Sequence, residues 1–169
     1  MNTKQADEKA LAYHEAGHAI IALHFDFSFT EVSILESSQS LGRVVLNKFS
    51  LPVDCETNDD TRAMLDKFIQ VILAGGIAES KFTGKKSKLD TDDLRKCYEL
   101  TEQYWGRIQN VQQTYFEFMK ALTASMFVSL NAREQKINSR LWKKVERIAK
   151  NLLKHKTINF EDVEKIYSQ

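Results

Sequence analysis

The chain has 169 residues, 43% hydrophobic and 28% charged, which is enough for one domain with a hydrophobic core. Its 24 Lys and Arg residues nearly balance 23 Asp and Glu residues, so the net charge of +1 gives no overall attraction to nucleic acid or an anionic membrane. Two cysteines are too few for a disulfide framework, and neither a secretion signal nor a run of about 18 apolar residues is present. We therefore expect a cytoplasmic protein with no membrane span.

The first third of the chain predicts a long helix followed by a small hairpin. A broad apolar face over residues 6–25 is typical of a buried helix. Residues 31–35 and 43–49 have the pattern of short strands, and the polar segment between them ends in Gly42. One proline and six glycines in the whole chain favour long helices over many short strands.

The remainder of the chain is predicted to be almost entirely helical. Thr57 and Asp60 have capping-box spacing before an apolar helix, in which Gly75-Gly76 allows either a helix end or a close backbone approach. A basic loop is expected over residues 82–90, and further helices over 90–101, 111–131, 138–154 and from Asn159. The predicted class is mainly α (α+β), a helical bundle with a small two- or three-stranded β ribbon.

The motif that carries chemistry is H-E-x-x-H, formed by residues 14–18 within the first helix. His14 and His18 are four residues apart and therefore lie on one face, where both imidazoles can bind one Zn²⁺. Glu15 projects beside such a metal and can take a proton from water there and pass it to a leaving amine. Gly17 is costly within a helix, so we expect a packing reason for it, such as another backbone that passes close to the metal.

A zinc hydrolase needs a third protein ligand, and the residue pattern alone leaves its identity open. His24 falls well off the metal-facing side of the helix, and the extended histidine pattern of metzincins is absent. The candidates that remain are Asp90, Asp92, Asp93, Glu79 and His155.

Residues 11–22 closely resemble the active-site helix of the FtsH-type zinc proteases, which are the proteolytic partners of an AAA+ unfoldase. Four further stretches resemble that family in the same order, namely 32–35 with 40–42, 65–79, 91–95 and 140–166. The resemblance implies one FtsH-like zinc peptidase domain over residues 1–169. Residues 1–108 would form its metal-site half, and residues 109–169 its C-terminal helical part.

The resemblance also implies roles for individual residues. Asp93 would be the third zinc ligand, Glu15 the catalytic base, and Glu79 a partner that orients an imidazole. The chain departs from the family's Gly-containing turn just before the aspartate, so Asp92 and Asp90 remain alternatives. A substrate strand would pair near residues 32–35 or 40–44, closest at Leu41 and Gly42, unless this hairpin only packs on the helix.

The sequence contains neither a phosphate-binding G-x-x-x-x-G-K-[ST] loop nor the family's membrane segment. We therefore expect peptides or unfolded proteins as substrates, with a separate AAA+ ATPase and a homo-oligomer as possible partners. The nine basic residues of 133–156 are better explained as the solvated face of a helix than as a nucleic-acid site. The alternative function is a non-catalytic FtsH-peptidase-like domain that binds peptides or partner chains.

Overall fold

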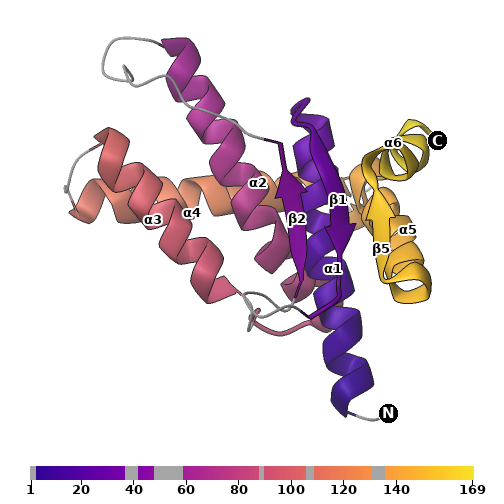
Figure 1. Ribbon diagram of the computed structural model, residues 1–169. Coiled ribbons are helices and arrows are strands. Elements are labelled where there is room, and N and C mark those ends of the chain that lie inside the picture. Colours follow the sequence, from indigo (N-terminus) through magenta and orange to yellow (C-terminus); the bar gives the residue numbers. More distant parts are fainter. Residues whose placement is uncertain (1–2, 37–41, 48–58, 88–89, 106–108, 131–135) are drawn as a thin grey trace.

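Helix α1 (Thr3–His24) runs through the middle of the computed structural model, with α2 (Asp59–Thr83) and α5 (Arg140–His155) packed against it (Figure 1). The structure describes residues 3–36, 42–47, 59–87, 90–105, 109–130 and 136–169. The other elements are β1 (Phe29–Ser33), β2 (Arg43–Leu46), α3 (Asp90–Trp105), α4 (Gln109–Met126), β3 (Val128–Leu130), β4 (Lys136–Asn138), β5 (Thr157–Asn159) and α6 (Phe160–Ser168). This arrangement confirms the predicted mainly α (α+β) class. None of the described helices combines the length and apolarity needed to cross a lipid bilayer.

Small residues bring α1 and α2 into close contact. The side chains of Ala12, Ala16 and Ala19 are fully buried. A Cβ added at Gly17 would lie 2.5 Å from the carbonyl oxygen of Ala74 on α2, closer than real Cβ contacts allow. The packing reason expected for Gly17 is therefore the backbone of α2, and the contact fixes the distance between the two helices.

A three-stranded antiparallel sheet, in the order β2-β1-β5, lies beside α1. Val32 at the centre of the sheet is fully buried and pairs with Val44 on β2 and with Ile158 on β5. Among the described strands β2 therefore has one unpaired edge. The location of the third strand was not predicted, because three residues are too short a run to show a period of two.

Several element boundaries differ from the sequence-based prediction. The helix expected over 111–131 ends at Met126, and the residues just beyond it form β3, which pairs with β4. Helix α5 begins at Arg140 and not at 138, because the Ser139 hydroxyl caps it by accepting from the backbone N–H of Trp142. Helix α2 continues through Gly75-Gly76 to Thr83, so the loop predicted from residue 82 begins later. The predicted cap at Thr57 lies outside the described residues.

Helix α5 is amphipathic in the way the sequence indicates. Its core-facing side buries Trp142, Val145, Ile148, Ala149 and Leu152. The basic residues Arg140, Lys143, Arg147, Lys150 and Lys154 are exposed. The apolar side chains therefore hold α5 against the core while the charges stay solvated.

Candidate metal centre

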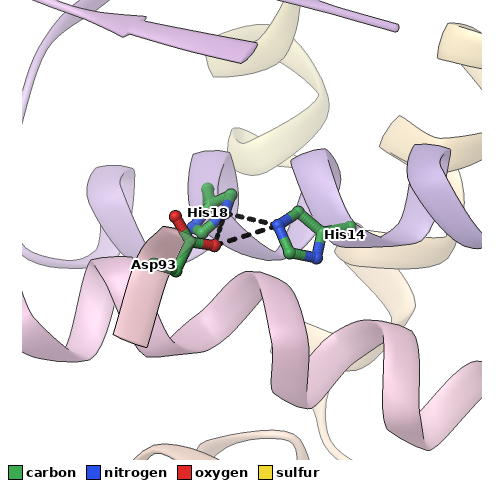
Figure 2. A group of neighbouring side chains, drawn as sticks. All are labelled: His14, His18 and Asp93. Carbon is green, nitrogen blue, oxygen red and sulfur yellow. Dashed lines mark hydrogen bonds and ion pairs between the residues drawn. The ribbon is translucent and has the colours of Figure 1, made fainter. Parts of the chain in front are cut away.

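Two turns of α1 and the first turn of α3 bring three potential metal ligands together (Figure 2). His14 and His18 project from the same face of α1, with their Nε2 atoms 3.0 Å apart. Asp93 reaches them from α3, and its Oδ2 lies 3.1 Å from Nε2 of His14 and 3.2 Å from Nε2 of His18. The three side chains are at most 12% exposed, so the cluster is screened from bulk water.

The size of this triangle fits a tetrahedral zinc ion. Two ligands that each lie about 2.0–2.1 Å from zinc at a tetrahedral angle are about 3.3–3.4 Å apart. The three observed separations of 3.0–3.2 Å are close to that value. Two imidazole nitrogens and one carboxylate oxygen are also a donor set that zinc accepts, and three protein ligands leave a fourth position for water.

Each imidazole is oriented through its other nitrogen, so that Nε2 is directed at the candidate metal position. His18 donates from Nδ1 to the backbone carbonyl of Val71, 2.8 Å away. Nδ1 of His14 lies 3.3 Å from Oε2 of Glu79, a buried carboxylate on α2. Such partners fix the tautomer and raise the basicity of a metal-binding imidazole.

Glu15 lies next to the ligand cluster and is almost fully buried, at 5% exposure. A Cβ added at Gly42, just before β2, would lie 2.6 Å from Oε1 of Glu15 and 2.9 Å from the Leu11 side chain. The backbone at Gly42 therefore covers the carboxylate directly. Leu41, the second predicted substrate contact, lies outside the described residues.

The ionisable groups of the cluster shift one another's pKa values. Burial alone lowers the pKa of His14, but hydrogen bonds to Asp93 and Glu79 and the charge of Glu15 outweigh it and raise that pKa to about 9. Burial acts to raise the pKa of Asp93, but the charge of His18 and hydrogen bonds from both imidazoles hold it well below its ordinary value. Burial raises the pKa of Glu15, against the opposing effect of the two histidines. A protonated His14 thus compensates the acidic groups around it.

A cleft of about 800 Å³ opens at the cluster. It is lined by Gly42 and β2, by residues of α1 and α2, and by the first turns of α3. Val44, Leu46 and Phe68 give it apolar surface, while Arg43 and Arg95 add charge. The edge strand of the sheet thus runs along the cleft that contains Glu15 and the three ligands.

The structure separates Asp93 from the other candidates for the third ligand. The side chain of Asp92 is 83% exposed and pairs with Arg95 at 3.7 Å. His24 lies at the end of α1, where its Nδ1 is 3.4 Å from the hydroxyl of Tyr167. His155 is exposed in the last turn of α5, and the side chain of Asp90 is outside the described part. Of the described candidates only Asp93 reaches both imidazoles.

Sequence reasoning missed two contributors to the centre and noted a third, Gly75, without its partners. The Val71 carbonyl is a backbone group and has no sequence signature. Gly75 lies beneath the imidazoles, and its only signal was the Gly-Gly pair within an apolar helix. The hydroxyl of Ser87 donates to Glu79, and a lone serine in a basic segment gave no signal for this.

Comparison with known proteins agrees with this geometry. The curated ATP-dependent zinc metalloprotease FTSH 11, chloroplastic/mitochondrial, of Arabidopsis thaliana is 24% identical over 182 aligned residues. The alignment covers 98% of this chain and 22% of that protein, so the chain spans about a fifth of the relative's length. The sequence profile of Peptidase family M41 matches residues 1–125, a range that includes all three potential ligands and Glu15. Because this match covers most of the chain, the protein belongs to peptidase family M41 and has an FtsH-type peptidase domain.

Proposed function

We propose that this chain is a zinc-dependent endopeptidase that hydrolyses peptide bonds in peptides or unfolded proteins. The observation that carries the proposal is the position of Glu15, a buried carboxylate beside a three-ligand cluster at the base of a cleft. A site that only stored zinc would have no use for a carboxylate there, whereas hydrolysis needs a base.

His14, His18 and Asp93 would hold the zinc ion, and Glu79 and the Val71 carbonyl would keep the two imidazoles in the required tautomer. When bound, zinc would supply a Lewis acid that lowers the pKa of water and polarises the carbonyl of the substrate. The side chains of the protein itself would carry out the proton transfers and bind the substrate.

Glu15 would act as the general base and then as the general acid. Its carboxylate takes a proton from the attacking water and delivers it to the amine that leaves when the peptide bond breaks. Burial raises the pKa of Glu15, which brings a carboxylate closer to the neutral pH where it must both accept and release a proton.

The substrate would bind as an extended strand along β2. This strand has an unpaired edge among the described strands and lines the cleft, so its backbone N–H and C=O groups can pair with a peptide. Gly42, and by resemblance Leu41, would be closest to the bond that is cut, because Gly42 lies over Glu15. Unfolded segments adopt such an extended strand more readily than the packed elements of a folded protein do.

The Arabidopsis relative is named as an ATP-dependent protease. We therefore include in the proposal an ATPase, on another part of a longer chain or on a separate protein, that delivers unfolded segments of folded substrates. Peptides and already unfolded proteins would be cleaved without it.

The proposal is tested by measuring zinc content and casein cleavage for the wild type and Glu15→Gln. The variant should retain zinc and lose about 10²-fold or more of its cleavage rate, because it lacks the proton-transferring group. Glu164→Gln on the exposed face of α6 is the matched control and should cleave normally. Wild-type protein that holds zinc but cleaves no unfolded substrate would favour the peptide-binding alternative, and normal cleavage by Glu15→Gln would contradict the mechanism.

A further inference from the structure

One oxygen atom of Glu79 is shared between the metal centre and a serine outside it. Oε2 of this carboxylate lies 3.3 Å from Nδ1 of His14 and also accepts a hydrogen bond from the hydroxyl of Ser87. We propose that Ser87 is a positioning residue of the metal centre, which holds Glu79 in the orientation that fixes the His14 imidazole. The inference rests on the proposed zinc peptidase function and adds a residue to it.

Ser87 is itself held firmly against the end of α2. Its side chain is buried, and its backbone N–H donates to the Ser80 hydroxyl at 2.9 Å. Thr83, in the last turn of α2, donates to the Glu79 carbonyl at 2.9 Å and accepts from the backbone N–H of Lys85 at 3.2 Å. These bonds tie the residues after α2 to the same helical turn that carries Glu79, so the Ser87 hydroxyl has a defined position.

The hydrogen bond from Ser87 determines where the Glu79 carboxylate points. A carboxylate on a flexible side chain has several rotamers, and fixing one oxygen selects the rotamer that faces His14. When Glu79 accepts a hydrogen bond from Nδ1–H of His14, the free lone pair of the imidazole is on Nε2. That nitrogen can then bind a metal. Without the hydroxyl, Glu79 loses this constraint and the His14 ring loses its orientation.

The two imidazoles differ in how they are supported. His18 is oriented by a backbone carbonyl of α2, which no side-chain substitution removes. His14 depends on a relay of two side chains, Ser87 and then Glu79. A defect at Ser87 should therefore act on one of the three ligands only, and weaken metal binding without abolishing it.

The test compares metal binding by the wild type, Ser87→Ala and Ser87→Thr. Zinc affinity is measured by competition with a chromophoric chelator, and the ligand field by the visible absorption of the Co²⁺-loaded protein. Ser87→Ala should bind zinc about 10-fold more weakly, at the lower end of the effect of groups that support metal ligands, and show a changed Co²⁺ spectrum. Ser87→Thr keeps the hydroxyl and should restore both readouts.

Ser125→Ala is the control, because this exposed serine on α4 donates to the backbone carbonyl of Leu122 and not to a carboxylate of the metal centre. It should bind zinc as the wild type does. If Ser87→Ala fails to fold, Ser87→Cys keeps the side-chain length with a much weaker donor, and its zinc affinity should fall in the same direction.

Wild-type affinity and spectrum in Ser87→Ala, or no recovery in Ser87→Thr, would overturn the role of Ser87. These outcomes are distinct from failure of the proposed function, in which the wild type itself would bind no zinc at this site or would bind zinc without cleaving unfolded substrates. Loss of thermal stability in Ser87→Ala with unchanged zinc affinity would show that the residue only packs, and would also overturn the proposal.

Discussion

A Cβ added at Gly75 would lie 2.2 Å from Nε2 of His18, well inside van der Waals contact. The same atom would be 2.8 Å from Nε2 of His14, so the α2 backbone forms the floor beneath both candidate ligands. Glycine costs about 1 kcal/mol relative to alanine within a helix, and Gly75 is well inside α2. The space that the imidazoles occupy is the physical reason for glycine at this position.

Gly75→Ala should therefore lose zinc binding while the chain still folds. The new methyl group forces the His18 ring to turn away, and the ligand triangle is lost. We expect zinc affinity to fall at least about 100-fold, more than removal of a group that only orients a ligand. The free energy of unfolding of the metal-free chain should stay within about 1 kcal/mol of wild type, because alanine favours the helix. Chelator competition and urea denaturation measure the two effects, and unchanged zinc affinity would contradict the placement of Gly75.

Gly42→Ala should impair the proposed base, Glu15, and leave zinc binding by the metal ligands intact. Its methyl group would meet Oε1 of Glu15 at 2.6 Å, whereas the nearest atoms to it do not include either imidazole. Displacement of the carboxylate should reduce the rate of casein cleavage about 10-fold or more, since proton transfer requires hydrogen-bonding distance. Zinc affinity should remain close to wild type. A variant with unchanged cleavage would show that Gly42 does not control the position of Glu15.

Gly17→Ala should weaken the fold itself. The added methyl group would meet the carbonyl oxygen of Ala74 at 2.5 Å, and a backbone atom cannot turn aside as a side chain can. Forcing α1 and α2 apart in a packed core should cost roughly 1–3 kcal/mol in the free energy of unfolding. Urea denaturation of the metal-free chain gives this value directly. A variant as stable as wild type would mean that the two helices are not in the close contact described above.

The stability of the metal-free chain should fall as pH rises from neutral to above 9. Four ionisable groups face His14: Glu15 and His18 on α1, Glu79 on α2 and Asp93 on α3. Although burial lowers the pKa of His14, the hydrogen bonds to Asp93 and Glu79 raise it to about 9 in the folded chain, against an ordinary value of 6.5. A raised pKa stabilises the fold fully below the unfolded value, and this contribution is lost as pH rises through the folded value.

The size of this loss is on the order of 3 kcal/mol between pH 6.5 and about 9. Urea denaturation in the presence of a chelator, at intervals across this range, measures it. His14→Asn removes the titrating group and should abolish most of the change in unfolding free energy with pH. The comparison therefore distinguishes His14 from other groups that titrate near pH 9. Equal slopes in the two proteins would show that His14 is not protonated in the metal-free fold.

The sequence alone was enough to predict the parts of the centre that are local. The i, i+4 spacing of His14 and His18 places both on one helical face wherever the helix packs. This pair could therefore be predicted from the sequence alone. Asp93 is 75 residues beyond His18, and only the resemblance to a known family selected it among nearby carboxylates. Three-residue strands such as β5 have no recognisable period, and their pairing depends on where distant segments meet in space.

The backbone contacts of the site could not be predicted either, because they depend on how two helices pack against each other. The Val71 carbonyl binds His18 only because α2 crosses α1 at a particular height, which the small residues along both helices permit. Gly75 could be noted as unusual, but its partner could not be named without the relative position of the helices. Such contacts follow from packing between elements and not from the pattern within one of them.

The position of β5 has a consequence for the part of the chain beyond the family match, which ends at residue 125. Ile158 pairs with Val32, so the C-terminal segment covers one side of the central strand β1. A chain truncated before Thr157 would leave that side bare, so that the five-residue β1 would replace the three-residue β5 as an edge strand. Short edge strands hinder the pairing of sheets from different copies, so the segment that carries β5 should also act against aggregation.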